Sequence, residues 1–334
     1  MIIAVTGATE HIGMNLVHAL AAKRHEVRAL IPGDSHSIRN LGVQTIKGDV
    51  RDSLSLSRAF SGAEVVYHVS QLVSNSSSDW PILEAINITG TRNVVEACLQ
   101  CEVKRLVHFS TVRALIQEPL NLPLNERRPL AESEDCQPYD RSRAAAEREI
   151  RKGLELGLDA VLLVPTGVIG PFDYQPSQIG EILLALGQGK LTALVQEGFD
   201  WVDARDVVQA ALRAAEVAPT GAKYLLSGAW VSFPDLARLI QDLTGKGAPR
   251  LVVPAWMART GAPMITAFNQ ATRQRLSVPN LPFTDLGSCN PAVSSERAAK
   301  ELNYRPRPLV QTLADTFKWY QEAGLFNRSI RLKT

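Results

Sequence analysis

The start of the chain contains the clearest chemical pattern in the sequence. An apolar stretch, Ile2 to Val5, runs directly into Thr6-Gly7-Ala8-Thr9-Glu10-His11-Ile12-Gly13. Strand–turn–helix segments of this kind bind dinucleotides. The first glycine permits a tight bend, the second lets the backbone approach a pyrophosphate, and the third lets the helix pack on the strand. Gly7 and Gly13 match the first and third positions, so we expect a phosphate-binding turn here.

Glu10 occupies the middle position of this turn. A carboxylate about 5 Å from a phosphate charge opposes binding by about 3 kcal/mol at an effective dielectric near 20, or about a hundredfold in affinity. Its side chain also crowds the place where the backbone must approach the ligand. The sequence therefore predicts weak dinucleotide binding unless Glu10 points into solvent.

A second pattern is Tyr139-Asp140-Arg141-Ser142-Arg143. It looks like a catalytic Tyr-x-x-x-Lys motif in which arginine replaces the lysine. The alternative is that Arg143 belongs to a basic helix surface together with Arg141, Arg148 and Arg151, because residues three and four apart share a helix face.

The composition is that of an ordinary globular chain. With 334 residues, 45% hydrophobic and 21% charged, and a net charge of +2, it gives no reason to expect disorder, nucleic acid or a membrane as partner. Apolar runs reach strand length only, and the N-terminus begins with a core strand, so we predict a cytoplasmic protein. The 4 cysteines are too few for a disulfide framework and the 6 histidines form no cluster, so we expect no metal.

Short apolar stretches alternate with helical patterns in the first half of the chain. This alternation is typical of a doubly wound parallel sheet, the Rossmann-type α/β fold. We expect strands near residues 2–6, 26–31, 43–47, 64–69, 104–110 and 159–164. We expect helices near residues 12–23, 53–60, 81–100 and 139–156.

Proline and glycine interrupt the alternation beyond residue 165, and the later pattern is mainly helical with few strands. We expect these later helices near residues 179–188, 204–216, 233–244 and 309–323. The sequence predicts a dinucleotide-binding core of residues 1–165, to which 201–227 returns. Residues 166–200 and 228–334 are expected to form a smaller substrate-binding lobe.

Beyond the glycine turn, further segments in order along the chain resemble the extended short-chain dehydrogenase/reductase family. The similarity is to its NAD(P)-dependent epimerase/dehydratase and dihydroflavonol-reductase-like branch. The segments are Gly48-Asp49-Val50-Arg51-Asp52, His68, Asn87 to Asn93, Ser110-Thr111, Pro138-Tyr139, Pro165 to Pro171, Trp201-Val202-Asp203 and Ser294 to Pro308. The resemblance covers nearly the whole chain.

The resemblance implies NAD or NADP lying across the strand ends, with its pyrophosphate at the first helix N-terminus. Asp49 and Val50 would contact the adenine, and Asn87 would steady the helix behind the site. The second strand ends in Ala29-Leu30-Ile31-Pro32, with neither an acidic residue for an NAD ribose nor an adjacent arginine for a phosphate, so the cofactor choice stays open. The implied cofactor-binding residues are Gly7, Thr9, Glu10, His11, Ile12, Gly13, Asp49, Val50, Val69, Ser70, Gln71, Asn87, Tyr139, Arg143, Pro165, Gly167 and Val168.

The resemblance also implies catalytic roles. Tyr139 would be the acid/base, Thr111 would orient the substrate oxygen with Ser110 as second choice, and Arg143 would supply the positive charge that a phenol of pKa about 10 needs. Arginine keeps the charge of lysine but cannot release a proton and has a longer, planar head group. Expected substrate-facing residues are Gln71, Ser74, Phe172, Asp173, Tyr174 and Trp201.

These patterns predict an NAD(P)-dependent oxidoreductase that reduces an aldehyde or ketone on a small, partly apolar substrate. Two alternatives stay open: a family member without turnover that binds a metabolite or partner, and a sugar epimerase/dehydratase. Fold alone does not decide between them. The resemblance further implies a homodimer through the helices near 81–100 and 139–156. With Ile82, Ala85 and Ile86, the first of these helices has more apolar positions than packing against one face of the sheet requires.

Overall fold

The computed structural model describes residues 1–33, 36–254, 289–327, 330 and 332. Its centre is a seven-stranded sheet whose strands all pair in parallel, in the order β10-β6-β5-β4-β1-β2-β3. The strands are β1 (Ile2–Thr6), β2 (Glu26–Ile31), β3 (Gln44–Lys47), β4 (Val65–His68), β5 (Arg105–Phe109), β6 (Ala160–Pro165) and β10 (Lys223–Leu226). The expected Rossmann-type fold is confirmed.

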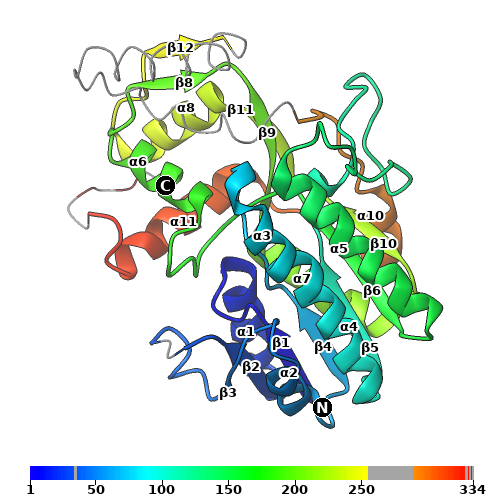
Figure 1. Cartoon of the computed structure of the whole chain (residues 1–334). Helices are drawn as coiled ribbons and strands as arrows, with labels where there is room; N and C mark the ends of the chain where they lie inside the picture. Colours follow the sequence, from blue (N-terminus) through cyan, green and yellow to red (C-terminus); the bar gives the residue numbers. More distant parts are fainter. Residues whose placement is uncertain (34–35, 255–288, 328–329, 331, 333–334) are drawn as a thin grey trace.

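Helices cover both faces of this sheet (Figure 1). On one face α1 packs beside α7, and on the other α4 packs between α2 and α5. These helices are α1 (His11–Ala22), α2 (Ser53–Phe60), α4 (Gly90–Gln100), α5 (Pro138–Glu155) and α7 (Ala204–Val217). Because both faces are covered, strands such as β6 are buried at every position, which explains their continuous apolar sequence.

The helix expected near 81–100 is interrupted in its hydrogen-bond pattern. It comprises α3 (Trp80–Leu83), a π-helical turn η2 (Glu84–Thr89) and α4. Asn87 lies in this π-helical turn and is fully buried at 0% exposure. π-Helical turns are rare and often occur beside functional sites, and this one packs against α5, the helix that begins with Pro138 and Tyr139.

The second lobe contains more strand than the sequence suggested. β11 (Ala229–Ser232), β9 (Gly198–Asp203) and β7 (Gly167–Ile169) form a three-stranded sheet, and β12 (Leu251–Val253) pairs with β8 (Ala193–Val195). The expectation of few strands here was wrong, because strands of three to six residues next to glycines and prolines are too short to show a period. The helices are α6 (Gln178–Gly187), α8 (Phe233–Thr244), α10 (Glu296–Leu302) and α11 (Leu309–Glu322).

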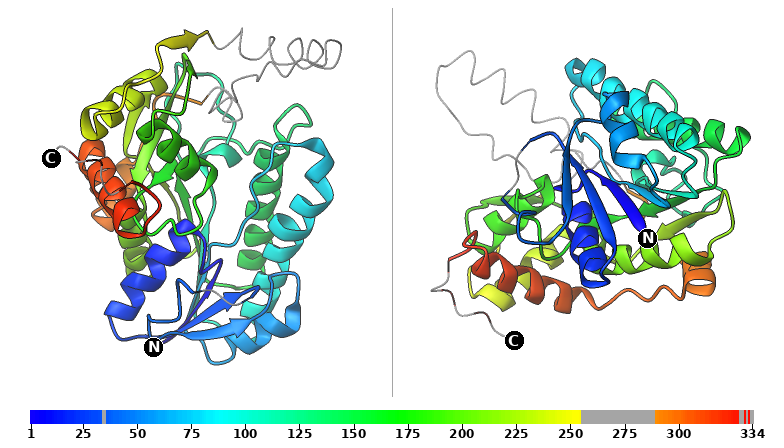
Figure 2. Two further views of the ribbon diagram at one scale, coloured as in Figure 1. Left: turned by 90° about the vertical axis from the view of Figure 1, so that its left-hand side faces the viewer. Right: turned by 90° about the horizontal axis from the view of Figure 1, so that it is seen from below.

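The chain crosses between the two lobes more than once. β9 belongs to the small sheet, whereas α7 and β10, which follow it, return to the central sheet. The part of the expected substrate lobe at residues 255–288 lies outside the described residues. The second lobe sits beyond the carboxyl ends of β1, β4, β5 and β6 (Figures 1 and 2), which is where open parallel sheets bind ligands.

Candidate active site

A cavity of about 420 Å³ lies between the strand ends and the second lobe. Its wall combines residues of the glycine turn, the ends of β4, β5 and β6, the start of α5, and the second lobe. The lining residues are Thr9, Glu10, His11, Ile12, Val69, Gln71, Val73, Ser110, Thr111, Arg113, Tyr139, Pro165, Thr166, Gly167, Val168, Asp173, Gln175, Ser177, Gln178, Ile179 and Phe199. The topology thus brings together three motifs that are far apart in sequence.

The glycine turn has the geometry that close packing of helix on strand requires. Gly7 has φ +65, and a Cβ there would lie 2.6 Å from the backbone nitrogen of Ser70. A Cβ on Gly13 would lie 2.0 Å from the carbonyl oxygen of Gly7. Only glycine fits at either position. Asn15 Nδ2 donates to the carbonyl oxygen of Pro171 at 2.8 Å and joins the first turn of α1 to the second lobe.

Glu10 lies across this turn rather than out in solvent. Its Oε1 accepts a 3.2 Å hydrogen bond from the backbone N–H of Gln71, which follows β4. Loss of hydration raises the pKa of the carboxyl to about 8, against the lowering effects of the Gln71 hydrogen bond and the Arg143 charge. A group with this pKa is mostly neutral at pH 7. The like-charge repulsion at neutral pH is therefore smaller than the full value worked out from the sequence, and the effect of Glu10 on dinucleotide affinity stays a prediction.

Tyr139 is 4% exposed and starts α5 at the cavity wall. Its hydroxyl donates a 2.7 Å hydrogen bond to Gln71 Oε1. Burial raises the pKa of the phenol above its usual value, although the guanidinium charges of Arg143 and Arg113 lower it. The phenol is thus protonated at neutral pH and can act as a proton donor.

Arg143 is a buried residue, at 0% exposure, and does not belong to an exposed basic helix surface. Its Nη2 donates to the carbonyl oxygen of Phe109 at the end of β5. Its Nε and Nη1 are buried without hydrogen-bond partners among the described residues. Because unsatisfied buried donors cost about 1–3 kcal/mol each, they indicate a missing acceptor. Arg143 is not itself in the cavity wall, so its contact with a cofactor ribose, which the resemblance implied, stays a prediction.

Thr111 and Ser110 differ in what they can do. Both line the cavity, but Ser110 Oγ donates a 2.6 Å hydrogen bond to Glu147, whose other oxygen pairs with Lys223. Glu147 is fully buried, so this network fixes the end of β5 against α5 and β10. Thr111 accepts from the backbone N–H of Arg113 at 3.3 Å, and its hydroxyl also hydrogen-bonds Tyr139, which lowers the pKa of that phenol. This arrangement favours Thr111 as the substrate-orienting hydroxyl.

Other implied cofactor residues take several positions. Thr9, His11, Ile12, Val69, Pro165, Gly167 and Val168 line the cavity. Asp49 and Val50 lie outside its wall, where Asp49 accepts two 2.8 Å hydrogen bonds from Arg51 and Val50 is buried against Gly90. Asn87 bridges Leu72 and Ser142, which ties the end of β4 to α5. Asn87 does not line the cavity, and the supporting role that the resemblance implied for it stays a prediction.

Only two of the expected substrate-facing residues, Gln71 and Asp173, line the cavity. Trp201 is 1% exposed and packs between Phe199 and Phe233 in the core of the second lobe. The three others also lie outside the wall: Ser74 bonds Asp79, Phe172 stacks on His18, and Tyr174 packs against Trp319. Large aromatic residues in this lobe serve its core, which explains the misplacement.

Sequence reasoning missed Arg113, which lies in the short η3 turn (Val112–Ala114) after β5. It lines the cavity and its guanidinium carbon lies 5.1 Å from the centre of the Tyr139 ring. A lone arginine after a strand resembles any surface residue, so no sequence signal distinguishes it. Among the described residues, no cluster of His, Cys, Asp and Glu could hold a metal, and no helix is long and apolar enough to span a bilayer. Cytoplasmic location stays a prediction.

Comparison with known proteins gives consistent matches over most of the chain. The model of the NAD dependent epimerase/dehydratase family matches residues 3–226. Sterol demethylase protein B of Methylococcus capsulatus is 31% identical over 96% of this chain and 98% of its own length. A putative dihydroflavonol 4-reductase of Synechocystis is 28% identical over 96% of this chain and 94% of its own length.

Solved structures agree with these sequence relatives. The crystal structure of gox2253 superposes with a TM-score of 0.84 at 27% identity, over 98% of this chain and 99% of that one. DesIV, a dTDP-glucose 4,6-dehydratase of Streptomyces venezuelae solved with NAD bound, has a TM-score of 0.78 at 21% identity over 98% of this chain and 99% of its own. The second likeness shows the fold alone.

Proposed function

The chain belongs to the NAD-dependent epimerase/dehydratase family, and we propose that it reduces the carbonyl group of a small, partly apolar substrate with NADH or NADPH. The observation that carries this proposal is that Tyr139 and Thr111 lie together in the cavity wall, while the buried Arg143 guanidinium is close enough to lower the pKa of the Tyr139 phenol. Relatives named as reductases support it, including a cinnamoyl-CoA reductase of Oryza sativa at 28% identity. Both nicotinamide cofactors remain candidates.

The residues present fit a dinucleotide. The first turn of α1 presents backbone N–H groups for a pyrophosphate, and Arg143 has unpartnered donors for a ribose. When bound, reduced nicotinamide supplies a hydride to the carbonyl carbon. Glu10, mostly neutral at pH 7, does not exclude an anion from the turn.

Tyr139 donates the proton in this proposal. Its hydroxyl now bonds the Gln71 amide oxygen, so a substrate carbonyl oxygen would replace that amide as acceptor. Thr111 would donate a second hydrogen bond to the same carbonyl oxygen and fix its position. Arg143 cannot lose a proton, so Tyr139 would be reprotonated from solvent rather than through the residue that holds the ribose.

The test is turnover of an aldehyde and ketone panel with NADH and NADPH, alongside titration of both nucleotides by fluorescence. We expect saturable nucleotide binding and loss of nicotinamide absorbance with at least one carbonyl. Binding without turnover on the whole panel would favour the alternative of a binding protein without catalysis. Conversion of nucleotide sugars without net nicotinamide consumption would favour the epimerase alternative.

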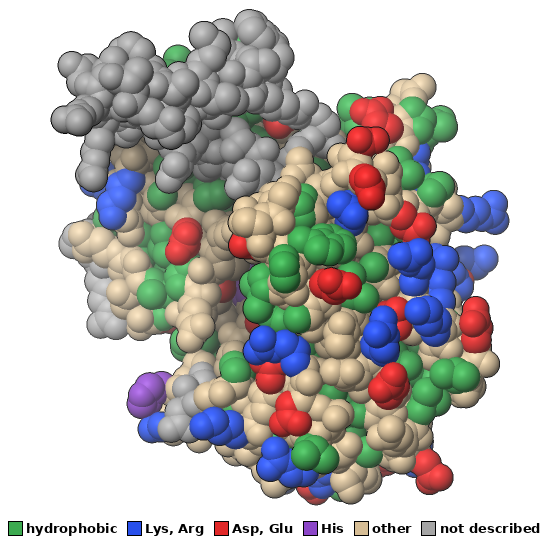
Figure 3. All heavy atoms as spheres, viewed as in Figure 1, with side chains coloured by type: hydrophobic (Ala, Val, Ile, Leu, Met, Phe, Trp, Pro, Cys, Tyr) green, Lys and Arg blue, Asp and Glu red, His purple; other side chains and the backbone are tan. Residues whose placement is uncertain are grey.

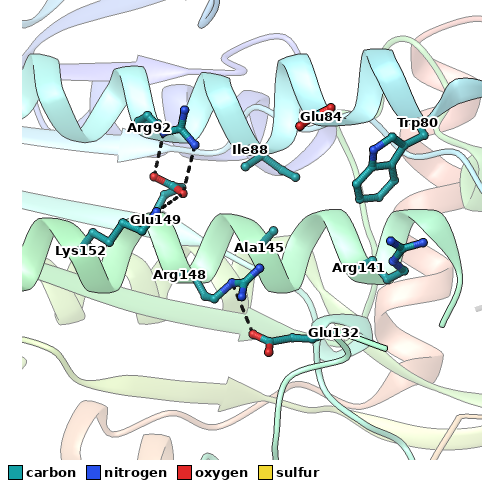
Figure 4. A pocket seen from close by; sticks show the side chains of 10 residues that line it. All are labelled: Trp80, Glu84, Ile88, Arg92, Glu132, Arg141, Ala145, Arg148, Glu149 and Lys152. Atoms are coloured by element: carbon teal, nitrogen blue, oxygen red, sulfur yellow. Dashed lines mark hydrogen bonds and ion pairs between the residues drawn. The ribbon is translucent and has the colours of Figure 1, made fainter. Parts of the chain in front are cut away.

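We also propose a homodimer through the helices on either side of a surface groove of about 450 Å³ (Figure 4). Arg141 lies over the Trp80 ring at 4.6 Å, and Arg92 and Lys152 both pair with Glu149 along the groove. Figure 3 shows acidic and basic side chains interspersed over this face. Such a mixed surface with apolar side chains between the charges suits a self-complementary interface.

A further inference from the structure

Arg113 is a mostly buried residue that nevertheless reaches the wall of the cavity. It lies in the short η3 turn (Val112–Ala114) that follows Thr111 at the end of β5. Its side chain is only 7% exposed, yet the residue lines the cavity that also contains Thr111 and Tyr139. Arginine is almost never buried without a partner, so its surroundings define its role.

Two side chains hold the Arg113 guanidinium from different elements. Asp140 Oδ1, on α5, lies 2.7 Å from Nε, and Asn75 Oδ1 accepts a 3.0 Å hydrogen bond from Nη2. Nη1 makes no hydrogen bond or ion pair to any residue that the structure describes. A planar fork fixed along one side with a free nitrogen on the other is suited to receive a further carboxylate.

We infer that Arg113 binds a carboxylate of the substrate, so that the compound reduced is an oxo acid. This inference rests on the proposed function, because it identifies the substrate class of that site. The guanidinium lies against the ring of Tyr139. A carboxylate held by Arg113 is therefore close to a carbonyl held by Tyr139, which indicates an α- or β-oxo acid rather than a long dicarboxylic compound.

The rest of the cavity favours a single negative charge. Asp173 is also in its wall, and Asp140 already pairs with Arg113. A doubly charged phosphate would face these carboxyl groups with one free guanidinium nitrogen to balance it. A carboxylate carries one negative charge and therefore needs less positive charge to balance it. The apolar part of the wall, with Val73, Val168 and Ile179, leaves room for a hydrocarbon substituent.

The experiment compares a stable oxo acid with its methyl ester. We expect kcat/KM to favour the acid by about ten- to a hundredfold, the range for a hydrogen bond to a charged group. Arg113→Met should bring the acid-to-ester ratio close to one, and Arg113→Lys, which keeps the charge without the fork, should give an intermediate ratio. Arg151→Met is the matched control, because Arg151 is exposed on α5 and should leave the ratio unchanged.

Binding of an unreactive acid separates this inference from the proposed function. A saturated carboxylic acid of the same length and its methyl ester are titrated by calorimetry, with no need for turnover. Acid preference that disappears in folded Arg113→Met protein supports the inference even if no carbonyl is reduced. Equal affinity for acid and ester in the parent, or an undiminished preference in folded Arg113→Met protein, overturns it even if reduction is observed.

Discussion

Glu10 should make nucleotide binding depend on pH between pH 7 and pH 9. Its carboxyl has a pKa of about 8, because it is removed from water between the glycine turn and Gln71. The ionised fraction therefore rises from about one-tenth at pH 7 to about nine-tenths at pH 9. The ionised form opposes a bound pyrophosphate, so binding must weaken as pH rises through the pKa and must take up a proton above it.

The size of the effect follows from two numbers. A carboxylate about 5 Å from a phosphate charge opposes binding by about 3 kcal/mol, so the ionised protein binds about a hundredfold more weakly than the neutral one. Weighted by the ionised fractions, the apparent Kd for NADPH or NADH should rise about tenfold from pH 7 to pH 9. Glu10→Gln keeps the shape of the side chain without the charge, so its Kd should change less than about threefold over that range.

Fluorescence titration of both proteins with the tighter-binding nucleotide, in steps from pH 7 to pH 9, measures this directly. The Arg143 guanidinium, whose charge lowers the pKa of the Glu10 carboxyl, stays protonated in this window. A flat profile in the parent protein would refute the reasoning. So would a tenfold change that persists in Glu10→Gln, because another group would then be responsible.

Three further outcomes are expected. Tyr139→Phe should abolish turnover while the nucleotide Kd stays within a few-fold, and Thr111→Ala should reduce turnover less. Steady-state kinetics and nucleotide titrations measure both effects, and unchanged turnover in Tyr139→Phe would mean that the proton donor is misassigned. Gly13→Ala should destabilise the fold by about 1–3 kcal/mol, because its Cβ would lie 2.0 Å from the Gly7 carbonyl oxygen. Gly247→Ala is the control, because a Cβ there meets nothing within 4 Å. Equal urea midpoints for the two variants would contradict this prediction. Ile82→Lys should dissociate the homodimer, because Ile82 is 40% exposed on the proposed interface; sedimentation showing a monomeric parent at micromolar concentration would rule that interface out.

The fold was predictable where periodicity is long. The strand at 26–31 and the helix at 53–60 were expected with the bounds that the structure gives, because their apolar positions repeat over several residues. The roles of Gly7 and Gly13 were also predictable, since steric exclusion of a Cβ depends on the local turn. The three-residue β7 and β8 were not, because they show no period.

The site was only partly predictable because side-chain direction depends on distant residues. The conformation of Glu10 is fixed by Gln71, which is separated from it by 61 positions in the chain. The choice of Thr111 over Ser110 depends on Glu147, a buried residue on another element. Arg113 acquires its role from Asn75 and Asp140, and no local pattern reports either contact.

Transfer of deuterium from C4 of the reduced nicotinamide to a carbonyl substrate tests the central claim most directly. We expect the parent protein to give an alcohol that carries one deuterium on the former carbonyl carbon, measured by mass spectrometry. Tyr139→Phe, with nucleotide binding retained, should give no labelled product. Nucleotide binding without label in any product of the parent, or equal labelling by Tyr139→Phe, would contradict carbonyl reduction with Tyr139 as the proton donor.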